Sequence, residues 1–213
     1  MTGPGAVLGL DLAGPAGSAR TAGLILVPSG TAWEVAAFRE GLSDADILAW
    51  MPEGIGVVGL DAPLSYPEAG GSRPADRAAR ARARDAGLAP ATVMAPLAPR
   101  MVYLTLRGLG LSRLLMTARP GVRLVEVHPA LALALRGLPA GDVRALKRSA
   151  AARRRLLAGL ERLGVQGAAR LPAASDHLVA AAAAALAAAD WAAGRPRWCH
   201  LADPPHHPYD FAA

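Results

Sequence analysis

Short apolar runs separated by turn residues dominate the first third of the chain and predict β-strands. The runs are residues 6–12, 20–27, 31–38 and 55–60. The second and third runs flank Pro-Ser-Gly, a turn of hairpin length. Between the third and fourth runs, residues 44–51 have apolar positions at helical spacing after Ser43, a residue type that favours helix starts. The pattern therefore predicts the order β-β-β-α-β.

The remainder of the chain is predicted to be mainly helical. The expected helices are an arginine-rich one at 75–86, one at 100–117 that is interrupted near Gly108 and Gly110, an amphipathic basic one at 142–163 and an alanine-rich one at 175–193. Residues 122–127 predict one further strand. Residues 195–213, the C-terminal tail, contain too much proline for regular structure. No linker interrupts the pattern, so a single α/β domain over residues 1–213 is expected.

The composition favours a folded domain outside membranes. Hydrophobic residues make up 53% of the 213 residues, although much of this is alanine. The longest apolar run, which begins at Leu178, is too short and too weakly hydrophobic to span a bilayer. The chain opens without a basic-then-apolar leader, and its single cysteine, Cys199, excludes a disulfide framework. We expect a soluble cytoplasmic protein with no membrane partner.

The charge of the chain is strongly positive and comes almost entirely from arginine. The formal net charge is +6, and Lys147 is the only lysine. This balance favours an anionic partner, nucleic acid first among candidates, or else reflects an arginine- and alanine-rich proteome. Aromatic residues are only 4%, which argues against a platform that stacks several bases of a single strand.

Acidic side chains stand at the carboxyl ends of three predicted strands. The near-repeats AVLGLDLAGP and VVGLDAPLSYP place Asp11 and Asp61 at the ends of their apolar runs, and Glu126 closes a third run. If these strands are neighbours, successive carboxylates lie about 5 Å apart and repel one another unless a proton or a cation sits between them. Such oxygen ligands favour Mg²⁺ or Mn²⁺, and two such ions can hold a phosphodiester.

A structural interpretation of the same acids stays open. Aspartate favours loop starts because its side chain hydrogen-bonds the nearby backbone. Asp176 lies in the first turn of the alanine-rich helix, where an acid also fits as a partner of the helix dipole.

Taken in order, these residues resemble the domain of unknown function 429 family, predicted nucleases with a ribonuclease-H-like fold. The matching segments are GLDLAG from Gly9, GLDAPLSYPEAGGSRPADRAAR from Gly59, VEVHPALALALRGLP from Val125, LKRSAAARRRLL from Leu146 and SDHLVAAAAAALAA from Ser175. The resemblance implies a mixed five-stranded sheet flanked by helices, with the first three strands antiparallel and strands one, four and five parallel and adjacent.

The same resemblance implies that four acids come together to hold metal and perform catalysis. They are Asp11, Asp61, Glu126 and Asp176. The chain departs from the family at Val179, where many relatives carry a further acid and valine cannot bind a cation. His177 could substitute for that acid, or it could be a solvated helical histidine.

Several basic and polar residues are candidates for holding the substrate. Arg73, Arg77, Arg80 and Arg84 share one helical face, which could hold phosphates or simply be solvated. Arg73, Asp76 and Lys147 also match positions of the resembled family. His128, which precedes Pro129, could cap a helix or carry a proton near the scissile group. The tail histidines could bind metal, but a packed or disordered tail is favoured.

Three functions are consistent with this sequence. The first is an Mg²⁺- or Mn²⁺-dependent nuclease, a hydrolase that uses two ions in the acid cluster. The second is a phosphotransferase of the actin, Hsp70 and sugar-kinase superfamily, whose first phosphate loop resembles GLDLAG. The third is a non-catalytic domain that binds nucleic acid or a protein. The kind of nucleic acid and the oligomeric state stay open.

Overall fold

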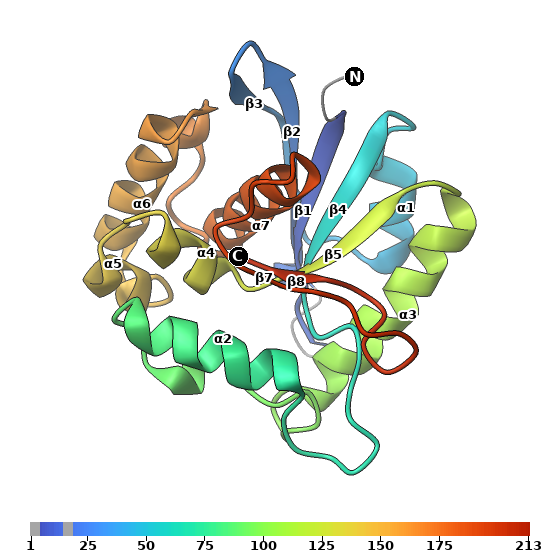
Figure 1. Ribbon diagram of the computed structural model, residues 1–213. Coiled ribbons are helices and arrows are strands. Elements are labelled where there is room, and N and C mark those ends of the chain that lie inside the picture. The colour runs from blue at the N-terminus through green and yellow to red at the C-terminus, as the bar shows by residue number, and fades with distance from the viewer. Residues whose placement is uncertain (1–4, 15–18) are drawn as a thin grey trace.

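The computed structural model describes residues 5–14 and 19–213, so the expectation about a leader falls partly outside the described residues. The centre of the fold is a mixed β-sheet (Figure 1). Its main strands are β1 (Ala6–Asp11), β2 (Ala22–Ser29), β3 (Ala32–Glu40), β4 (Ile55–Asp61) and β5 (Arg123–Val127). β1, β2 and β3 pair antiparallel, whereas β4 lies parallel to β1 and β5 parallel to β4. The expected strand directions and the expected adjacency of β1, β4 and β5 are therefore confirmed.

The sheet is larger than the five strands expected. Three short strands, β6 (Val165–Gln166), β7 (Cys199–His200) and β8 (Phe211–Ala212), extend it to eight strands within the described residues, in the order β6-β3-β2-β1-β4-β5-β8-β7. Two of them come from the C-terminal tail, for which we expected no regular structure. The prolines of the tail all lie outside β7 and β8, so its backbone donors remain free to pair there.

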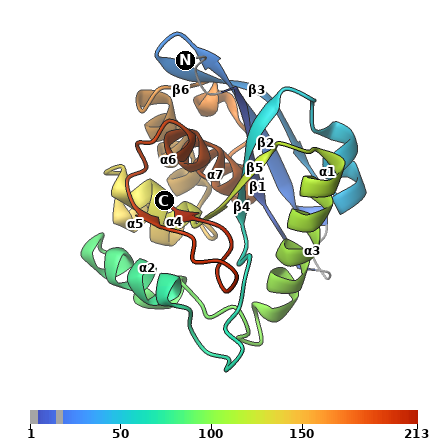
Figure 2. The ribbon, with the colours of Figure 1, turned by 45° about the vertical axis from the view of Figure 1, so that its right-hand side comes forward.

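Helices cover both faces of the sheet (Figures 1 and 2). One face packs against α7 (Asp176–Ala192), around which lie α2 (Pro74–Asp85), α4 (Pro129–Leu135), α5 (Ala140–Ala145) and α6 (Ala150–Arg162). The other face packs against α1 (Asp44–Trp50) and α3 (Val102–Ala118). The chain also contains two short 3-10 helices, η2 (Pro90–Thr92) and η3 (Ala168–Arg170). Successive apolar residues of β1 and β4 point to opposite faces of the sheet and pack in two separate hydrophobic cores.

Two glycines let α7 lie directly on the sheet. A Cβ at Gly9 would stand 2.2 Å from the backbone oxygen of Ala181 and 2.3 Å from the backbone nitrogen of Ala185. A Cβ at Gly59 would stand 2.8 Å from the backbone oxygen of Ala184. The alanines of α7 complete this close packing, and twelve of its residues, from Leu178 to Ala189, are buried. The glycine of each Gly-Leu-Asp repeat is therefore a helix-packing position.

Two predicted helices differ from the structure. α3 runs without interruption through Gly108. The glycine there makes room for the loop after β4, because a Cβ added at Gly108 would stand 2.9 Å from the backbone oxygen of Pro63. The predicted helix at 142–163 is divided into α5 and α6, because the side chain of Ser149 accepts from the backbone N–H of Ala152 and starts a new helix. Within the described residues, no helix combines the length and apolarity needed to cross a membrane.

Candidate functional site

Asp11 and Asp61 lie side by side at the carboxyl ends of β1 and β4. The two strands are parallel, and the register pairs Gly9 with Gly59, Leu10 with Leu60, and Asp11 with Asp61. In-register neighbours point to the same face of a sheet, so both carboxyl groups project toward the α7 side. We call these two residues the acid pair. The sequence-based expectation that they are neighbours is confirmed by the register.

The acid pair holds a proton more tightly than ordinary aspartates do. Burial and the neighbouring carboxyl of Asp11 raise the pKa of Asp61 well above its usual value. Burial also raises the pKa of Asp11, although the contact with His177 opposes this. Two carboxylates this close disfavour simultaneous ionisation unless a positive charge joins them.

Asp176 and His177 approach the acid pair from the first turn of α7. Nδ1 of His177 lies 2.6 Å from Oδ2 of Asp11, and its Nε2 lies 3.8 Å from Oδ1 of Asp176. The hydrogen bond to Asp11 raises the pKa of His177. Ser175 caps the helix by accepting from the backbone N–H of Leu178, which fixes where this turn begins. The sequence left open whether His177 joins the acids or is solvated, and the structure places it against Asp11.

An open cleft of about 460 Å³ borders this turn of α7. Arg20, two residues before β2, and Lys147, in the turn between α5 and α6, line it together with Glu40 and the residues 174–177. The positive charge of Lys147 also acts on Asp61, where it lowers the pKa against the larger effect of burial. The break between α5 and α6 therefore places the positively charged side chain of Lys147 near the acid pair.

Removing the charge of Asp61 should make the protein more stable at neutral pH. The pKa of Asp61 is higher in the folded state than in the unfolded chain, where it is about 3.8. The stabilisation by the protonated Asp61 side chain is therefore fully present below about pH 3.8 and is lost as the pH rises through the folded-state pKa. The Tm of Asp61→Asn should therefore exceed that of the wild type by an increasing margin above about pH 4. Thermal unfolding followed by circular dichroism from pH 3 to pH 8 measures this margin.

Asp142→Asn provides a control of opposite sign. The hydrogen bond from Arg155 lowers the pKa of Asp142, whose stabilisation is present above its unfolded value. This control should lower the Tm slightly at neutral pH and lose its effect in acid. A Tm margin of Asp61→Asn that is constant with pH, or that reverses sign, would contradict the raised pKa.

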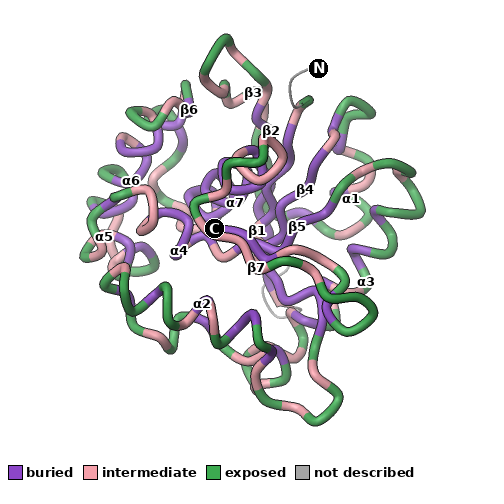
Figure 3. The backbone as a smooth tube through the Cα atoms, in the orientation of Figure 1, coloured by how far each residue is buried: buried purple, intermediate pink, exposed green. Residues whose placement is uncertain are grey.

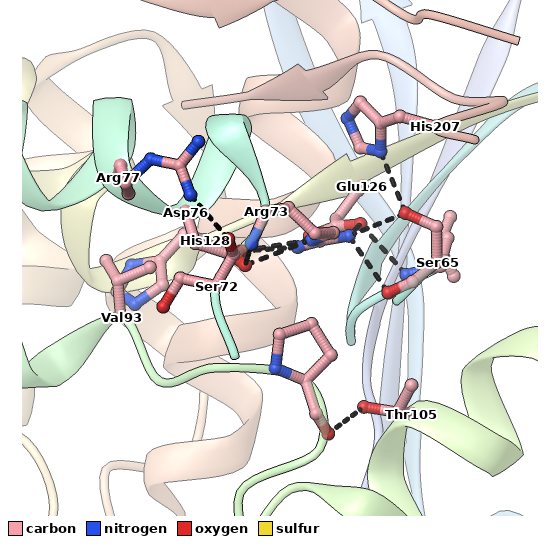
Figure 4. A network of polar contacts seen from close by, with 12 residues as sticks. Ser65, Ser72, Arg73, Asp76, Arg77, Val93, Thr105, Glu126, His128 and His207 are labelled. Atoms are coloured by element: carbon pink, nitrogen blue, oxygen red, sulfur yellow. Dashed lines mark hydrogen bonds and ion pairs between the residues drawn. The ribbon is translucent and has the colours of Figure 1, made fainter. Parts of the chain in front are cut away.

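Glu126 is held by a buried arginine instead of facing the acid pair directly. By the register of β4 and β5 it lies opposite Leu60, on the alternate face from Asp61. Its carboxylate accepts from Nη1 of Arg73 at 2.8 Å and from the backbone N–H of Leu64 at 2.9 Å, and it also accepts from Nη2 of Arg73 (Figure 4). Its charge nevertheless contributes to the raised pKa of Asp61.

Arg73 is the centre of a buried network that links three segments of the chain (Figure 4). Its guanidinium donates to Asp76, Glu126 and Ser65, and Asp76 accepts from the backbone N–H of Arg73 to start α2. Arg73 is 3% exposed, Asp76 1% and Glu126 2%. Burial acts to lower the pKa of Arg73, but Glu126 and Asp76 outweigh it and raise that pKa above its ordinary value. Arg73 and Asp76, expected near the substrate, lie inside the protein.

The other substrate-side candidates have structural partners as well. Nδ1 of His128 accepts from the backbone N–H of Leu131, and Nε2 of His128 lies 3.0 Å from the backbone oxygen of Thr92. His128 is therefore the cap of α4, the structural alternative that the sequence left open. Burial lowers its pKa. The exposed Arg77 donates to the backbone oxygen of Ser72.

The last two of the four arginines that share a helical face differ in their surroundings. Arg80 donates to the backbone oxygen of Val93 and to the side chain of Ser72, so it fastens α2 to its surroundings. Arg84 is exposed. The four arginines that share a helical face in the sequence therefore do not form one surface for phosphate.

The C-terminal tail completes the Arg73 network, which sequence reasoning did not anticipate. Phe211 of β8 pairs with Glu126 of β5, and its ring lies 5.8 Å from the guanidinium of Arg73. His207 contacts the hydroxyl of Ser65 through Nδ1 at 2.9 Å. Asp210 accepts from the indole N–H of Trp191. The segment HHPYDFA thus anchors the tail through buried His207 and Phe211. Its mixture of aromatic and acidic residues inside a proline-rich stretch was the available signal.

A divalent cation, implied by the family resemblance, fits the acid pair better than it fits Glu126. Within residues 5–14 and 19–213, no three histidine, cysteine, aspartate or glutamate side chains form a group that could hold a metal ion. The acid pair nevertheless offers two adjacent hard oxygen donors, and the charge of Asp176 acts on Asp11. Glu126 could join only after release from Arg73.

The comparisons with known proteins give one family match. The profile of the family described as "Protein of unknown function (DUF429)" matches residues 9–206, which covers most of the chain. No curated protein and no solved structure matches the chain significantly.

Proposed function

The chain belongs to the DUF429 family, and we propose that it is a metal-dependent phosphodiester hydrolase that acts on nucleic acid at the acid pair. The observation that supports this function best is the in-register placement of two partly buried carboxyl groups with raised pKa values at the carboxyl ends of parallel strands. Ligand sites of α/β sheets commonly lie at this edge. A divalent ion would relieve the repulsion that the proton now relieves.

We propose further that β3-β2-β1-β4-β5 is a ribonuclease-H-like core, to which β6, β8 and β7 are additions. The strand order and directions agree with those that the family resemblance implies. This assignment is consistent with a hydrolase but does not by itself require one, because one fold supports many activities.

The chain's own residues would divide the work at the site. Asp11 and Asp61 would lose the proton that their raised pKa values favour and would hold the cation instead, with Asp176 as a third oxygen donor. Bound there, Mg²⁺ or Mn²⁺ would supply charge stabilisation for phosphoryl oxygens. Lys147 and Arg20, on the walls of the cleft, would attract the phosphate of the substrate. His177 would keep a proton at Nδ1, beside Oδ2 of Asp11.

Manganese binding provides the direct test. Wild-type protein titrated with Mn²⁺ in a calorimeter should bind with release of protons, and with an affinity that rises with pH, because the proton of Asp61 must leave. Asp61→Asn should bind at least about tenfold more weakly, since even residues outside the first coordination sphere affect metal affinity by this much. Asp142→Asn, which changes an aspartate far along the chain on α5, should bind as the wild type does.

Cleavage should follow the same pattern. Assays with RNA, DNA, RNA–DNA hybrids and branched junctions, each with Mg²⁺ and with Mn²⁺, should show a product that Asp61→Asn reduces by about a hundredfold or more. Equal Mn²⁺ binding by the wild type and Asp61→Asn, or cleavage that survives the substitution, would reject the acid pair as the site.

The occupied carboxylates favour a second candidate, a non-catalytic domain that binds nucleic acid. Glu126 already has Arg73 as its counter-ion, and Asp11 has His177. In that case nucleic acid should bind without cleavage and without a need for Mn²⁺. Lys147→Ala should weaken that binding and reduce its dependence on salt.

A further inference from the structure

Most of the surplus positive charge of the chain lies in α5, α6 and the turn between them. Residues 140–163 contain seven of the 23 lysines and arginines but only two of the 17 acidic residues. This segment therefore carries +5 of the formal net charge of +6, and the rest of the chain is close to neutral. Such a concentration of charge indicates a surface for an anionic partner, and not a general property of the composition.

Six of these seven cations are exposed at the surface. The exception is Arg153, which is 9% exposed and donates to the backbone oxygens of Leu146 and Ala173. The arginines at 154, 155 and 162 share the outer face of α6, because positions seven and eight apart lie about two turns along a helix. The tube of α6 accordingly changes between purple and green or pink along its turns in Figure 3. We call the exposed set the basic ridge, which consists of Arg144, Lys147, Arg148, Arg154, Arg155 and Arg162.

The two acidic residues of the same segment neutralise little of the basic ridge. Asp142 pairs with Arg155, whose Nη2 lies 2.6 Å from Oδ1 of Asp142. Glu161 accepts from the backbone N–H groups of residues 167 and 169, and the charge of Arg170, outside the ridge, also acts on it. The other five residues of the ridge form no ion pair with any residue that the structure describes. The ridge therefore keeps an unpaired positive charge.

The basic ridge begins at the open cleft beside the acid pair. Lys147 lines this cleft, and α6, with 13 residues, extends about 20 Å from the turn that holds Lys147. In the cleft itself, Glu40 and Asp176 offset the charges of Arg20 and Lys147. The surplus of positive charge therefore lies outside the cleft, where it suits an anion that is longer than the cleft.

The chemistry of the basic ridge favours a phosphate backbone. The planar guanidinium of arginine binds phosphate oxygens through two parallel hydrogen bonds. Residues 140–163 contain no aromatic side chain that could stack on unpaired bases. The uncharged residues of the outer face of α6, Ala151 and Ala158, are too small to form the apolar centre of a protein interface. These features favour an occupant whose phosphates face outward and whose bases are paired.

We propose that the basic ridge binds the backbone of double-stranded nucleic acid, alongside the segment that enters the cleft. Arg154 and Arg162, about 12 Å apart along α6, contact phosphates at separate positions, and Lys147 connects the ridge with the cleft. This inference rests on the proposed function only in so far as the acid pair would act on the same duplex.

Fluorescence anisotropy with EDTA present measures this binding without a divalent cation. The probes are a labelled DNA duplex of about 20 base pairs, an RNA duplex of the same sequence and an oligo(dT) strand of the same length. At least one duplex should bind at least about fivefold more tightly than the single strand, because a duplex carries about twice the charge per unit length. Arg154→Gln/Arg162→Gln should weaken duplex binding about tenfold at about 0.1 M salt, and should reduce the slope of log K against log salt by about two.

A second double variant controls for net charge. Arg100→Gln/Arg113→Gln removes two exposed arginines just before and on α3, which covers the opposite face of the sheet, and should bind duplex within about twofold of the wild type. Three results would overturn the proposal. They are equal weakening by the two double variants, single-strand binding as tight as duplex binding, and displacement of duplex by poly-glutamate at equal charge concentration, which would indicate an acidic protein as the partner.

Cleavage assays separate the basic ridge from the acid pair. Asp61→Asn should bind duplex in EDTA at least as tightly as the wild type does, because Asp61 is not part of the ridge. A wild type that binds duplex through the ridge but cleaves nothing would reject the hydrolase and retain the ridge. Cleavage whose rate at limiting substrate is unchanged in Arg154→Gln/Arg162→Gln would reject the ridge and retain the hydrolase.

Discussion

Arg73→Met should destabilise the protein by about 3–5 kcal/mol, because removing one partner of a buried ion pair leaves an uncompensated charge. In this protein the loss affects two carboxylates at once, since Asp76 and Glu126 are both buried against the same guanidinium. For a domain of about this size, the Tm should fall by about 10 °C. Thermal and urea unfolding at pH 7 measure the change.

Two variants separate loss of charge from loss of packing. Arg77→Met, one turn along α2 and exposed, should change stability by no more than about 0.5 kcal/mol. The double variant Arg73→Met/Glu126→Gln should recover part of the loss, because it removes one of the two unpaired charges. A Tm of Arg73→Met within about 2 °C of the wild-type Tm would contradict this expectation. It would show that Glu126 does not need Arg73 as its counter-ion and could bind a cation instead.

Gly9→Ala should cost about 3 kcal/mol or more, at or beyond the upper end for overpacked sites. The new Cβ would press against the backbone of α7 at Ala181 and Ala185, and backbone atoms cannot rotate away as a flexible side chain can. The helix would have to lift from β1, which also displaces His177 from Asp11 at its first turn. Urea denaturation followed by far-UV circular dichroism measures the loss.

Alanine substitutions at two glycines of β4 test whether the loss of stability depends on how close the added Cβ comes to neighbouring atoms. Gly59→Ala should be milder than Gly9→Ala, because its contacts with α7 begin at 2.8 Å. Gly56→Ala, in the same strand, meets no atom within 4 Å and should be within about 0.5 kcal/mol of the wild type. Equal effects at Gly9 and Gly56 would show that strand propensity, and not contact with α7, decides the cost.

The local pattern was sufficient to place the main strands and the aspartate at the end of each Gly-Leu-Asp run, whereas the adjacency of these aspartates was implied only by the family resemblance. Short apolar runs predicted β1 and β4 closely, and the aspartates that end these runs lie side by side because parallel neighbours end at the same edge. The same pattern was insufficient for Glu126. Its position at a strand end was evident, but its face depends on register with β4 and its counter-ion lies 53 positions away.

The arginines show why spacing along a helix is a weak guide to function. Arg73, Arg77 and Arg80 have spacings that predict a common face, but the face turned toward the protein is decided by what α2 packs against. Arg73 is consequently buried among acids, whereas Arg77 is exposed. Net charge and helical periodicity contain no information about which of these positions a neighbouring segment covers.

The amino-acid sequence by itself determined the order of the main strands and helices, the two Gly-Leu-Asp strand ends and the resemblance to a family. These depend on periodicity and on residue types within short windows. Only the tertiary structure decided that Arg73 neutralises Glu126, that the tail strand β8 covers this pair, and that His177 meets Asp11. Each of these is a contact between distant segments, whose free energy depends on burial and register that no local window specifies.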